Sequence, residues 1–260
     1  MKVSWVCFAK PPIKGFVKTR LAKNLGEDSA LQIYSWLLSL QCSNLLEIER
    51  SALTSSKKYQ SRFNIYTSLP ADLKLTQGKM LFKNFFSAVI DKRSMKEGHQ
   101  RSKLQKRFFS KLKIKLQQGN NLGQKMENCI VQELKKNDLV VLWGSDVPFI
   151  TSEHLLSALE KYPNCSITPV ADGGYCLISI TKALYEEGFM NNIPWSHEKT
   201  LQVQLENMKS LNMSYKLNEK LYDIDIDKDL IFAIKKMTES NDPLLNKQIA
   251  QLQKWFEKFC

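Results

Sequence analysis

The chain has 260 residues, of which 43% are apolar and 25% are charged, and this composition is typical of a folded globular protein rather than a disordered one. The six cysteines are scattered, without a C-x-x-C pair or a histidine at ligand spacing, and therefore predict neither a zinc site nor a disulfide framework. The amino terminus is too short for a secretory signal, and no stretch reaches the roughly 18 apolar residues that cross a bilayer, so we predict a cytoplasmic protein.

Strand-like and helix-like segments alternate from the amino terminus onward. The elements predicted in the first half are a strand at 3–9, a helix at 28–50, a strand at 62–67, a helix at 121–136 and a strand at 139–143. The last of these is a continuous apolar run bounded by turn residues, which is typical of a strand buried on both faces. Residues 69–116 show no clean periodicity, so we predict no helix or strand for them.

The alternation continues in the second half. The elements predicted there are a helix from a cap at Thr151 or Ser152 through Tyr162, strands at 165–170 and 175–180, and a helix at 230–237 that Asp227 is placed to cap. Residues 241–260 carry apolar side chains at helical spacing, which favours an amphipathic helix packed on the domain over one lying on a membrane. The whole pattern predicts one α/β domain over residues 1–240, a three-layer α/β/α sandwich with a mostly parallel central sheet.

The net charge of +12 is concentrated in one segment. Residues 91–116 contain ten lysines or arginines and two acidic residues, a surplus of eight. We interpret this segment as a basic insert, either a solvated loop and helix or a surface that attracts nucleic acid, anionic lipid or a phosphorylated ligand. Because the chain has no RNP-type aromatic pattern and no zinc-finger spacing, we do not expect a dedicated nucleic-acid reader.

The loop after the first predicted strand has residues that suit phosphate. In open α/β sheets, ligands bind beyond the carboxyl ends of the strands, where this loop is expected to lie. It carries Lys10, Lys14, Lys18 and Arg20, and Gly15 lets the backbone come close to a ligand. Arginine can hold phosphate oxygens as a fork, whereas lysine acts as a point charge. The loop indicates a di- or triphosphate site or, with equal weight, a basic surface loop.

Asp146 follows the strongest predicted strand, within Gly144-Ser145-Asp146-Val147-Pro148. A carboxylate at a strand end can hold Mg²⁺ or Mn²⁺, which take oxygen ligands and share them with ligand phosphates. The alternative is an aspartate that only starts a turn. We predict that Asp146 is a metal ligand.

Two further loops carry aspartates. In Asp172-Gly173-Gly174-Tyr175 the glycines let the backbone pass close to a ligand, and Asp172 can bind a hydroxyl or act as a base, although the same residues are typical of a tight turn. In residues 223–227 three aspartates alternate with isoleucines, and such close carboxylates repel one another unless a cation or donors neutralise them. Asp223 or Asp225 is therefore a candidate second metal ligand.

Taken in this order, the loops resemble those of the bacterial glycosyltransferase A-like transferases (GT-A fold), which belong to the nucleotide-diphospho-sugar transferase superfamily. The resemblance covers about residues 3–230 and rests on five places: Phe8-Ala9-Lys10-Pro11 through Lys18-Thr19-Arg20-Leu21-Ala22, residues 118–126, residues 144–148, residues 172–175, and Ile193-Pro194-Trp195-Ser196 with Asp223-Ile224-Asp225. The family is similar in fold to the guanylyltransferases that make molybdenum cofactor and activate phospholactate.

The resemblance implies roles for single residues. Asp146 would hold the metal and Asp225 would complete its site. The implied catalytic residues are Lys18, Arg20 and Asp172, and the implied nucleotide contacts are Ala9, Lys10, Gly15, Lys18, Arg20, Gln118, Gly119, Gly123, Ser145, Gly173 and Gly174. Two positions depart from the family, which usually has aspartate at Asn121 and arginine at Lys125, so a carboxylate and a bidentate fork are lost.

The resemblance favours a transferase that uses a nucleotide-diphospho-sugar with Mg²⁺ or Mn²⁺ and glycosylates an unknown acceptor. The alternative is a guanylyl- or cytidylyltransferase-like enzyme acting on a phosphate or carboxylate, in keeping with the basic Lys18-Thr19-Arg20 loop. Both reactions depend on electrostatic stabilisation of the same phosphates, so the sequence separates them poorly. A third reading is a non-catalytic protein that binds an anionic partner through the basic segment.

Overall fold

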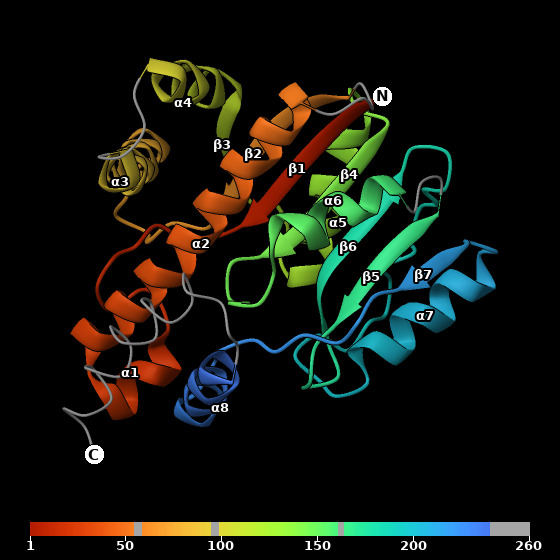
Figure 1. Cartoon of the computed structure of the whole chain (residues 1–260). Coiled ribbons are helices and arrows are strands. Elements are labelled where there is room, and N and C mark those ends of the chain that lie inside the picture. The colour runs from red at the N-terminus through yellow and green to blue at the C-terminus, as the bar shows by residue number, and fades with distance from the viewer. Residues whose placement is uncertain (55–58, 95–98, 161–163, 240–260) are drawn as a thin grey trace.

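The computed structural model describes residues 1–54, 59–94, 99–160 and 164–239. Within these ranges the chain forms a seven-stranded sheet in the order β3-β2-β1-β4-β6-β5-β7, with helices on both faces (Figure 1). Strand β6 runs antiparallel to its neighbours β4 and β5, and the other neighbouring pairs are parallel. The predicted three-layer α/β fold with a mostly parallel sheet is confirmed.

The bounds of the elements agree with the sequence where periodicity was strong. The strands are β1 (Lys2–Phe8), β2 (Gln60–Thr67), β3 (Leu112–Leu116), β4 (Leu139–Gly144), β5 (Cys165–Pro169), β6 (Tyr175–Thr181) and β7 (Tyr215–Leu217). The helices are α1 (Thr19–Leu25), α2 (Glu27–Thr54), α3 (Leu75–Ser94), α4 (His99–Lys111), α5 (Leu122–Leu134), α6 (Ser152–Glu160), α7 (Thr200–Ser210) and α8 (Asp227–Thr238). Among the helices in the described ranges, none is long and apolar enough to span a bilayer.

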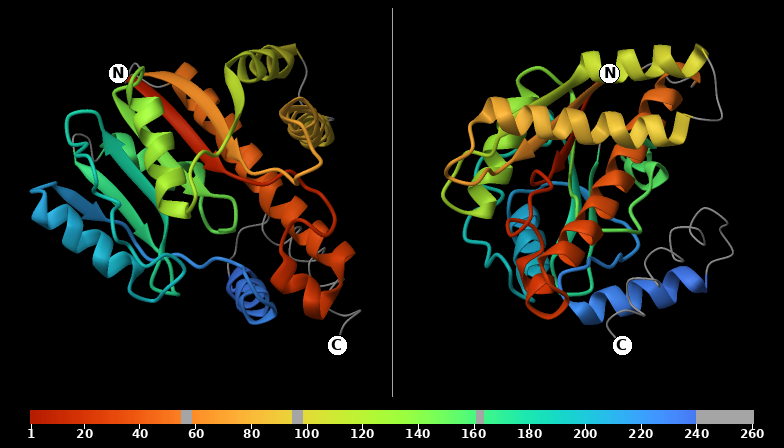
Figure 2. Two further views of the ribbon diagram at one scale, coloured as in Figure 1. Left: turned by 180° about the vertical axis from the view of Figure 1, so that it is seen from behind. Right: turned by 90° about the vertical axis from the view of Figure 1, so that its left-hand side faces the viewer.

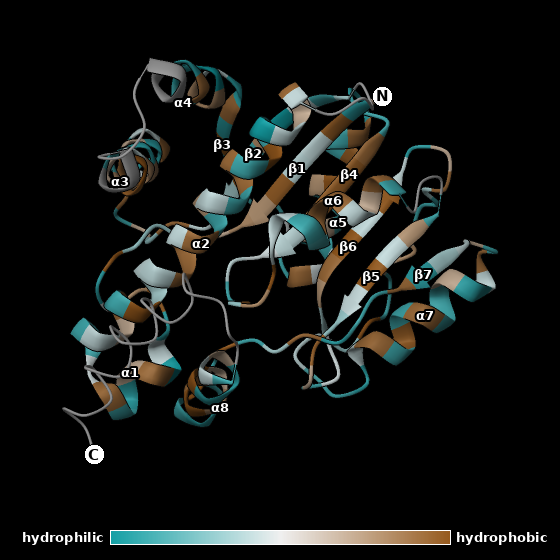
Figure 3. Ribbon diagram, in the orientation of Figure 1, coloured by the Kyte–Doolittle hydropathy of each residue, from teal (hydrophilic) through white to brown (hydrophobic). Residues whose placement is uncertain are grey.

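Alternate residues of each central strand supply the two faces of the sheet. Trp5 and Trp143 pack in a core with side chains of α2, α3, α4 and α6, whereas Val6 and Leu142 pack on the other face with α5 and α7. Hydrophobic and hydrophilic residues alternate along the helices, as expected where only one side of a helix covers a core (Figure 3).

A third, smaller core lies between α1, α2 and α8. Leu21 of α1, Ile33 of α2 and Leu230 of α8 are buried in it together with Ile224. Helices α1 and α8 lie near each other beyond the carboxyl end of β1 (Figure 1). This core therefore fixes the aspartate-rich segment before α8 at the same end of the sheet as the loop after β1.

Residues 69–116, which gave no assignment, contain α3, α4 and β3 at one end of the sheet (Figure 2). The predicted basic insert at 91–116 ends in β3, which pairs with β2 and places Lys113 and Lys115 on one face and Ile114 on the other. Lysines on such an outer strand discourage pairing with another chain. The predicted helix at 241–260 lies outside the described residues.

Part of the basic surplus neutralises two buried carboxylates. Glu49 is fully buried in α2 and is paired with Arg107 and, at 2.7 Å, with Lys111 Nζ. Glu133 of α5 is 4% exposed and is paired with Lys115. A buried charge is tolerated only when it is paired and hydrogen-bonded, so these cations hold α4 and β3 to the domain.

Candidate functional site

A cavity of about 500 Å³ opens at the carboxyl ends of β1 and β4. Its wall is assembled from the loops after these two strands, the loop between β5 and β6, the start of α5 and the segment before α8. This is the edge of an open α/β sheet at which ligands bind. Asp146, Asp223 and Asp225 stand in its wall together with Lys18 and Arg20.

The backbone brings two distant aspartates to one point. Asp146 follows β4, and its carbonyl oxygen accepts a hydrogen bond of 3.1 Å from the Ile224 N–H, which places the aspartate-rich segment beside it. Asp146 Oδ1 then lies 2.9 Å, and Asp225 Oδ1 3.2 Å, from Lys18 Nζ. The Ile224 carbonyl oxygen lies 2.5 Å from the same nitrogen. Three oxygens thus converge on one cation.

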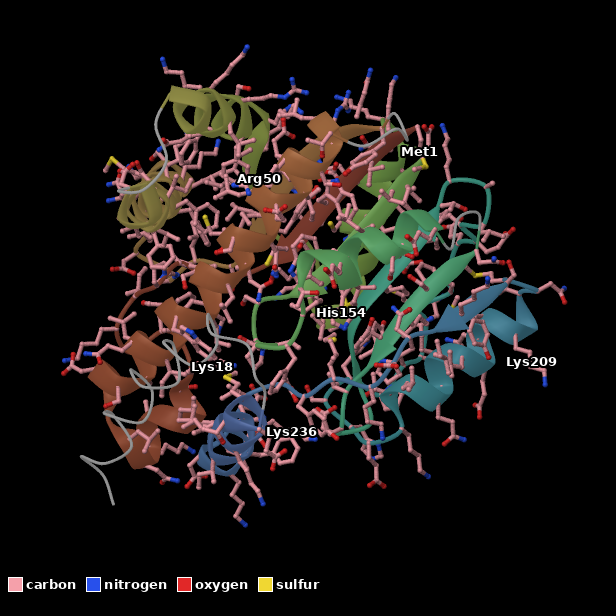
Figure 4. The ribbon with its side chains drawn as sticks, in the orientation of Figure 1. Met1, Lys18, Arg50, His154, Lys209 and Lys236 are labelled. Carbon is pink, nitrogen blue, oxygen red and sulfur yellow. The ribbon has the colours of Figure 1, made fainter. Side chains whose placement is uncertain are left out.

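Lys18 is the residue around which this cluster is arranged. Its side chain is 5% exposed, whereas those of Asp146 and Asp225 are 45% and 43% exposed. Lys18 and Met1 lie at opposite ends of the sheet (Figure 4). Burial alone would lower the pKa of Lys18, but the charges of Asp146 and Asp225 outweigh it, and the pKa is raised. The ammonium group therefore stays charged.

The backbone at Lys18 is held in the left-handed region, with φ 46° and ψ 45°, directly before α1. This conformation costs a residue with a side chain about 1–2 kcal/mol. It is one of four residues other than glycine with positive φ in the described part of the chain. We attribute the strain to the sharp turn that directs the Lys18 side chain toward the carboxylates of Asp146 and Asp225.

The rest of the loop after β1 is anchored through Tyr34 of α2. The Tyr34 hydroxyl accepts a hydrogen bond from the Lys10 N–H and donates one to the Lys10 carbonyl oxygen, each at 2.8 Å, and lies 3.4 Å from Ser145 Oγ. Burial raises the pKa of Tyr34, so the hydroxyl stays protonated. The Lys10 side chain is exposed, and its Nζ lies over the Phe16 ring, 4.8 Å from the ring centroid. Arg20 is 67% exposed, with Nη1 3.4 Å from Asp225 Oδ2.

Two further carboxylates line the cavity. Asp172 Oδ1 accepts a hydrogen bond of 2.9 Å from the Gly174 N–H, which makes the tight turn that the sequence allowed. Burial and the negative charges of Asp172 and Asp225 raise the pKa of Asp223 to about 6. Asp223 therefore has an environment different from that of Asp225, which faces Lys18 and Arg20.

Five predicted nucleotide contacts do not line the cavity: Gly15, Gln118, Gly119, Gly123 and Gly173. A Cβ at Gly173, where φ is +89°, would lie 2.1 Å from the Glu198 carbonyl oxygen, and one at Gly123 would lie 2.4 Å from Trp195 Nε1. These glycines allow backbone or an indole ring to pack closely. A contact of the five residues with nucleotide stays a prediction.

The remaining predicted residues stand together in the wall of the cavity. They are Ala9, Lys10, Lys18, Arg20, Ser145, Asp146, Asp172, Gly174 and Asp225. Sequence reasoning missed Tyr34, which showed only as part of an apolar helix stripe, and gave Trp195 no role beyond the resemblance. Trp195 lines the cavity beside Tyr175, with their ring centroids 6.1 Å apart.

One of the two departures from the family, Asn121, does not disturb the start of α5. Asn121 is the N-cap of α5, and its Oδ1 accepts a hydrogen bond of 2.9 Å from the Gln124 N–H. Aspartate and asparagine cap helices about equally well, so this substitution keeps the start of α5 in place. The cap prediction for α8 is wrong, because Ile226 is the N-cap and Asp227 is the first residue of the helix. Asp229 Oδ2 accepts hydrogen bonds from the Asp225 and Ile226 N–H groups, at 3.0 and 2.9 Å.

The donor atoms at Asp146 and Asp225 fit a hard divalent cation. Both carboxylates and the Ile224 carbonyl point oxygen atoms at one position, and Mg²⁺ and Mn²⁺ prefer oxygen ligands. In the described ranges, no group of three or more His, Cys, Asp or Glu side chains is arranged to hold a metal. A cation held here would therefore depend on further oxygens from a ligand.

Comparison with known families identifies the central part of the chain. Residues 87–197 match the family described as "Uncharacterized protein conserved in bacteria (DUF2064)". The match covers less than half of the chain. It includes β3, α5 and β4 and therefore the Asp146 loop, and it extends through the Asp172 loop to Trp195. No curated protein matches the sequence.

Solved structures agree in fold. A candidate nucleotide-diphospho-sugar transferase from Desulfovibrio desulfuricans G20 superposes with a TM-score of 0.74 and 23% identity, over 99% of this chain and 96% of that chain. A nucleotidyl transferase from Methanothermobacter thermautotroptrophicus gives 0.45 and 11%, over 90% and 95%. A cytidylyltransferase from Leptospira borgpetersenii gives 0.44 and 14%, over 99% and 94%. The first structure confirms the resemblance in fold, whereas the other two have TM-scores below 0.5.

Proposed function

We propose that the protein is a metal-dependent transferase that binds a nucleotide-diphospho-sugar in the cavity and transfers its glycosyl group to an acceptor. The observation that carries the proposal is the convergence of Asp146 Oδ1, Asp225 Oδ1 and the Ile224 carbonyl on one cation position. The description of the Desulfovibrio protein as a candidate nucleotide-diphospho-sugar transferase supports the same choice.

The cations of the loop after β1 suit the diphosphate. The Arg20 guanidinium is 67% exposed beside the carboxylate pair, and Lys10 is exposed in the same wall. Arginine can hold two phosphate oxygens at once, and lysine adds a point charge. Asp146 and Asp225 would hold Mg²⁺ or Mn²⁺, which when bound neutralises charge on the leaving nucleoside diphosphate. Positive groups fixed in advance stabilise that charge more than water does.

Another part of the cavity wall suits the sugar and the acceptor. Trp195 and Tyr175 form a half-buried aromatic pair there, and Asp172 stands in the same wall. An apolar ring face can pack against a sugar ring, and a carboxylate can accept the proton of an acceptor hydroxyl as it attacks. In this proposal, Asp172 is the base, with its position fixed by the Gly174 N–H.

Nucleotidyl transfer is the second candidate, and the basic loop after β1 favours it. Lys10, Lys18 and Arg20 all line the cavity and offer three cations to a bound phosphate chain. A triphosphate would use all three while a phosphate or carboxylate acceptor attacks in line. Both candidates need the same metal position, so the substrate decides between them.

A thermal-shift screen separates the candidates. Purified protein is heated with UDP-, GDP- and dTDP-sugars and with GTP and CTP, each with Mn²⁺, with Mg²⁺ and with EDTA. A ligand that binds only the folded state raises the melting temperature by mass action. Metal-dependent stabilisation by a diphosphate-sugar supports glycosyl transfer, and preference for a triphosphate supports nucleotidyl transfer. No response to any nucleotide would contradict both and leave the anion-binding alternative.

A further inference from the structure

Lys18 occupies the position at which the proposed metal would bind. Its Nζ is within 3.2 Å of both carboxylate Oδ1 atoms and 2.5 Å from the Ile224 carbonyl oxygen. Divalent cations of this class bind carboxylate oxygens at about 2.0–2.6 Å. A metal ion bound to the same three oxygens would lie almost on top of the ammonium nitrogen. The two cations therefore exclude each other.

The position of Lys18 is built into the fold. The side chain is 5% exposed although both aspartates remain nearly half exposed, and its backbone is held in the left-handed region. Arg20, two residues away, is 67% exposed, and its Nη1 lies 3.4 Å from the other carboxylate oxygen of Asp225, Oδ2. The structure thus provides one inward cation for the carboxylate pair and one outward cation for solvent or a ligand.

We infer that Lys18 is an internal counter-ion that keeps divalent metal out of the nucleotide-free site. The inference rests on the proposed function, because it assumes that Asp146 and Asp225 are the metal ligands. The phosphates of a nucleotide supply other oxygens for the Lys18 ammonium, which then leaves the two carboxylates to the metal. Metal and nucleotide bind together, and each raises the affinity for the other by the same factor.

This coupling would matter for a transferase that depends on a metal. In the absence of substrate, the site would hold no metal ion. Asp146 and Asp225 would nevertheless always have a cation beside them. Like charges within a few ångström disfavour each other's ionisation, so the carboxylates need one cation in each state. In the nucleotide-free state Lys18 is that cation.

The test is a titration of Mn²⁺ alone into nucleotide-free protein, followed by the electron paramagnetic resonance signal of unbound Mn²⁺. We compare the wild-type chain with Lys18→Met, which keeps an unbranched side chain only one atom shorter and removes the charge. Removing a cation from within bonding distance of the metal position should tighten Mn²⁺ binding by about tenfold or more. Lys18→Gln, which keeps a hydrogen-bond donor, serves as the second variant if Lys18→Met does not fold.

Lys14→Met is the matched control. Lys14 stands on the same loop, but its Nζ pairs with Asp28 at 2.8 Å and its side chain is 52% exposed outside the cavity. This variant loses the same net charge and should bind Mn²⁺ within about twofold of wild type, because an exposed charge at a distance is screened. Asp146→Asn placed in the Lys18→Met background should remove the tightened binding.

The outcomes separate the inference from the proposed function. Tighter binding in Lys18→Met and not in Lys14→Met supports the inference. Equally tight binding in wild type and Lys18→Met overturns the inference while leaving the metal site in place. If neither protein binds Mn²⁺ and nucleotide still stabilises the fold, the metal dependence of the proposed function is wrong, and the inference fails with it.

Discussion

Replacing Lys115 by methionine should destabilise the protein in a way that depends on pH. Lys115 is paired with Glu133, whose side chain is 5% exposed, and Glu133 also accepts hydrogen bonds of 2.8 Å from Ser4 Oγ and from the Tyr66 hydroxyl. Removing one partner of a buried pair costs about 3–5 kcal/mol. Because Lys115 is 29% exposed and the two hydroxyls remain, we expect about 2 kcal/mol at pH 7.

The sign of the pH dependence follows from Glu133. Burial alone would raise its pKa, but the hydrogen bonds from Lys115 and Tyr66 outweigh it, and the folded-state pKa lies below the ordinary 4.5. In wild type the group therefore contributes stability above pH 4.5, and that contribution is lost as the pH falls through the folded-state pKa. In Lys115→Met the pKa of Glu133 rises, so the variant should approach wild type in stability as the pH falls toward 4.

The assay is urea unfolding at pH 7 and at pH 4, followed by circular dichroism. Lys113→Met is the matched control, since Lys113 is exposed on the same strand and the same face, two residues away. It should cost less than about 0.5 kcal/mol at either pH, as surface substitutions usually do. Equal losses in the two variants at pH 7, or a loss in Lys115→Met that grows on acidification, would refute the reasoning about the buried pair.

Two further predictions concern the Asp146 loop and the Asp172 loop. Asp146→Asn should abolish metal-dependent stabilisation by nucleotide in the thermal-shift assay. The ligand-free variant should still fold, because its amide oxygen can accept a hydrogen bond from Lys18. A variant that does not fold would show that Asp146 serves the turn instead. Gly173→Ala should cost about 2–4 kcal/mol by urea unfolding, because its Cβ would lie 2.1 Å from the Glu198 carbonyl oxygen at positive φ. Gly174→Ala, whose nearest contact would be the Asp172 side-chain oxygen Oδ1 at 3.1 Å, should cost less than half as much, and equal costs would contradict the packing role.

The sequence predicted those parts of the fold whose signal is local. The apolar runs at β1 and β4 and the helical stripe of α2 were found within a few residues of their observed bounds, because buried strands and amphipathic helices repeat at fixed periods. Strand β3 was missed because it has five residues and alternates lysine with apolar residues beside a basic helix. Helix α7 and strand β7 were missed as well, since their half-exposed residues carry a weak periodic signal.

The sequence predicted the individual residues of the candidate site but not how they are arranged around Lys18. The rule for parallel sheets placed Asp146 and the basic loop at one edge, and the aspartate-rich segment indicated that a cation or hydrogen-bond donors must neutralise it. That Lys18 itself supplies this cation depends on the left-handed backbone before α1 and on the hydrogen bond from Ile224 to Asp146, 78 residues apart. Neither feature leaves a local pattern in the sequence, and this is why Lys18 was predicted as a catalytic residue and phosphate contact but not as the cation between the two aspartates.

The central claim is that Asp146 and Asp225 hold a divalent metal together with a nucleotide. The most direct measurement is a crystal structure of the protein grown with Mn²⁺ and the nucleotide that stabilises it best, in which the anomalous signal locates the metal. We predict a Mn²⁺ ion within about 2.0–2.3 Å of an oxygen of each aspartate and of a phosphate oxygen, with Lys18 Nζ moved away from both carboxylates. Nucleotide bound in the cavity with Lys18 still between the aspartates, and no metal at that position, would contradict the claim.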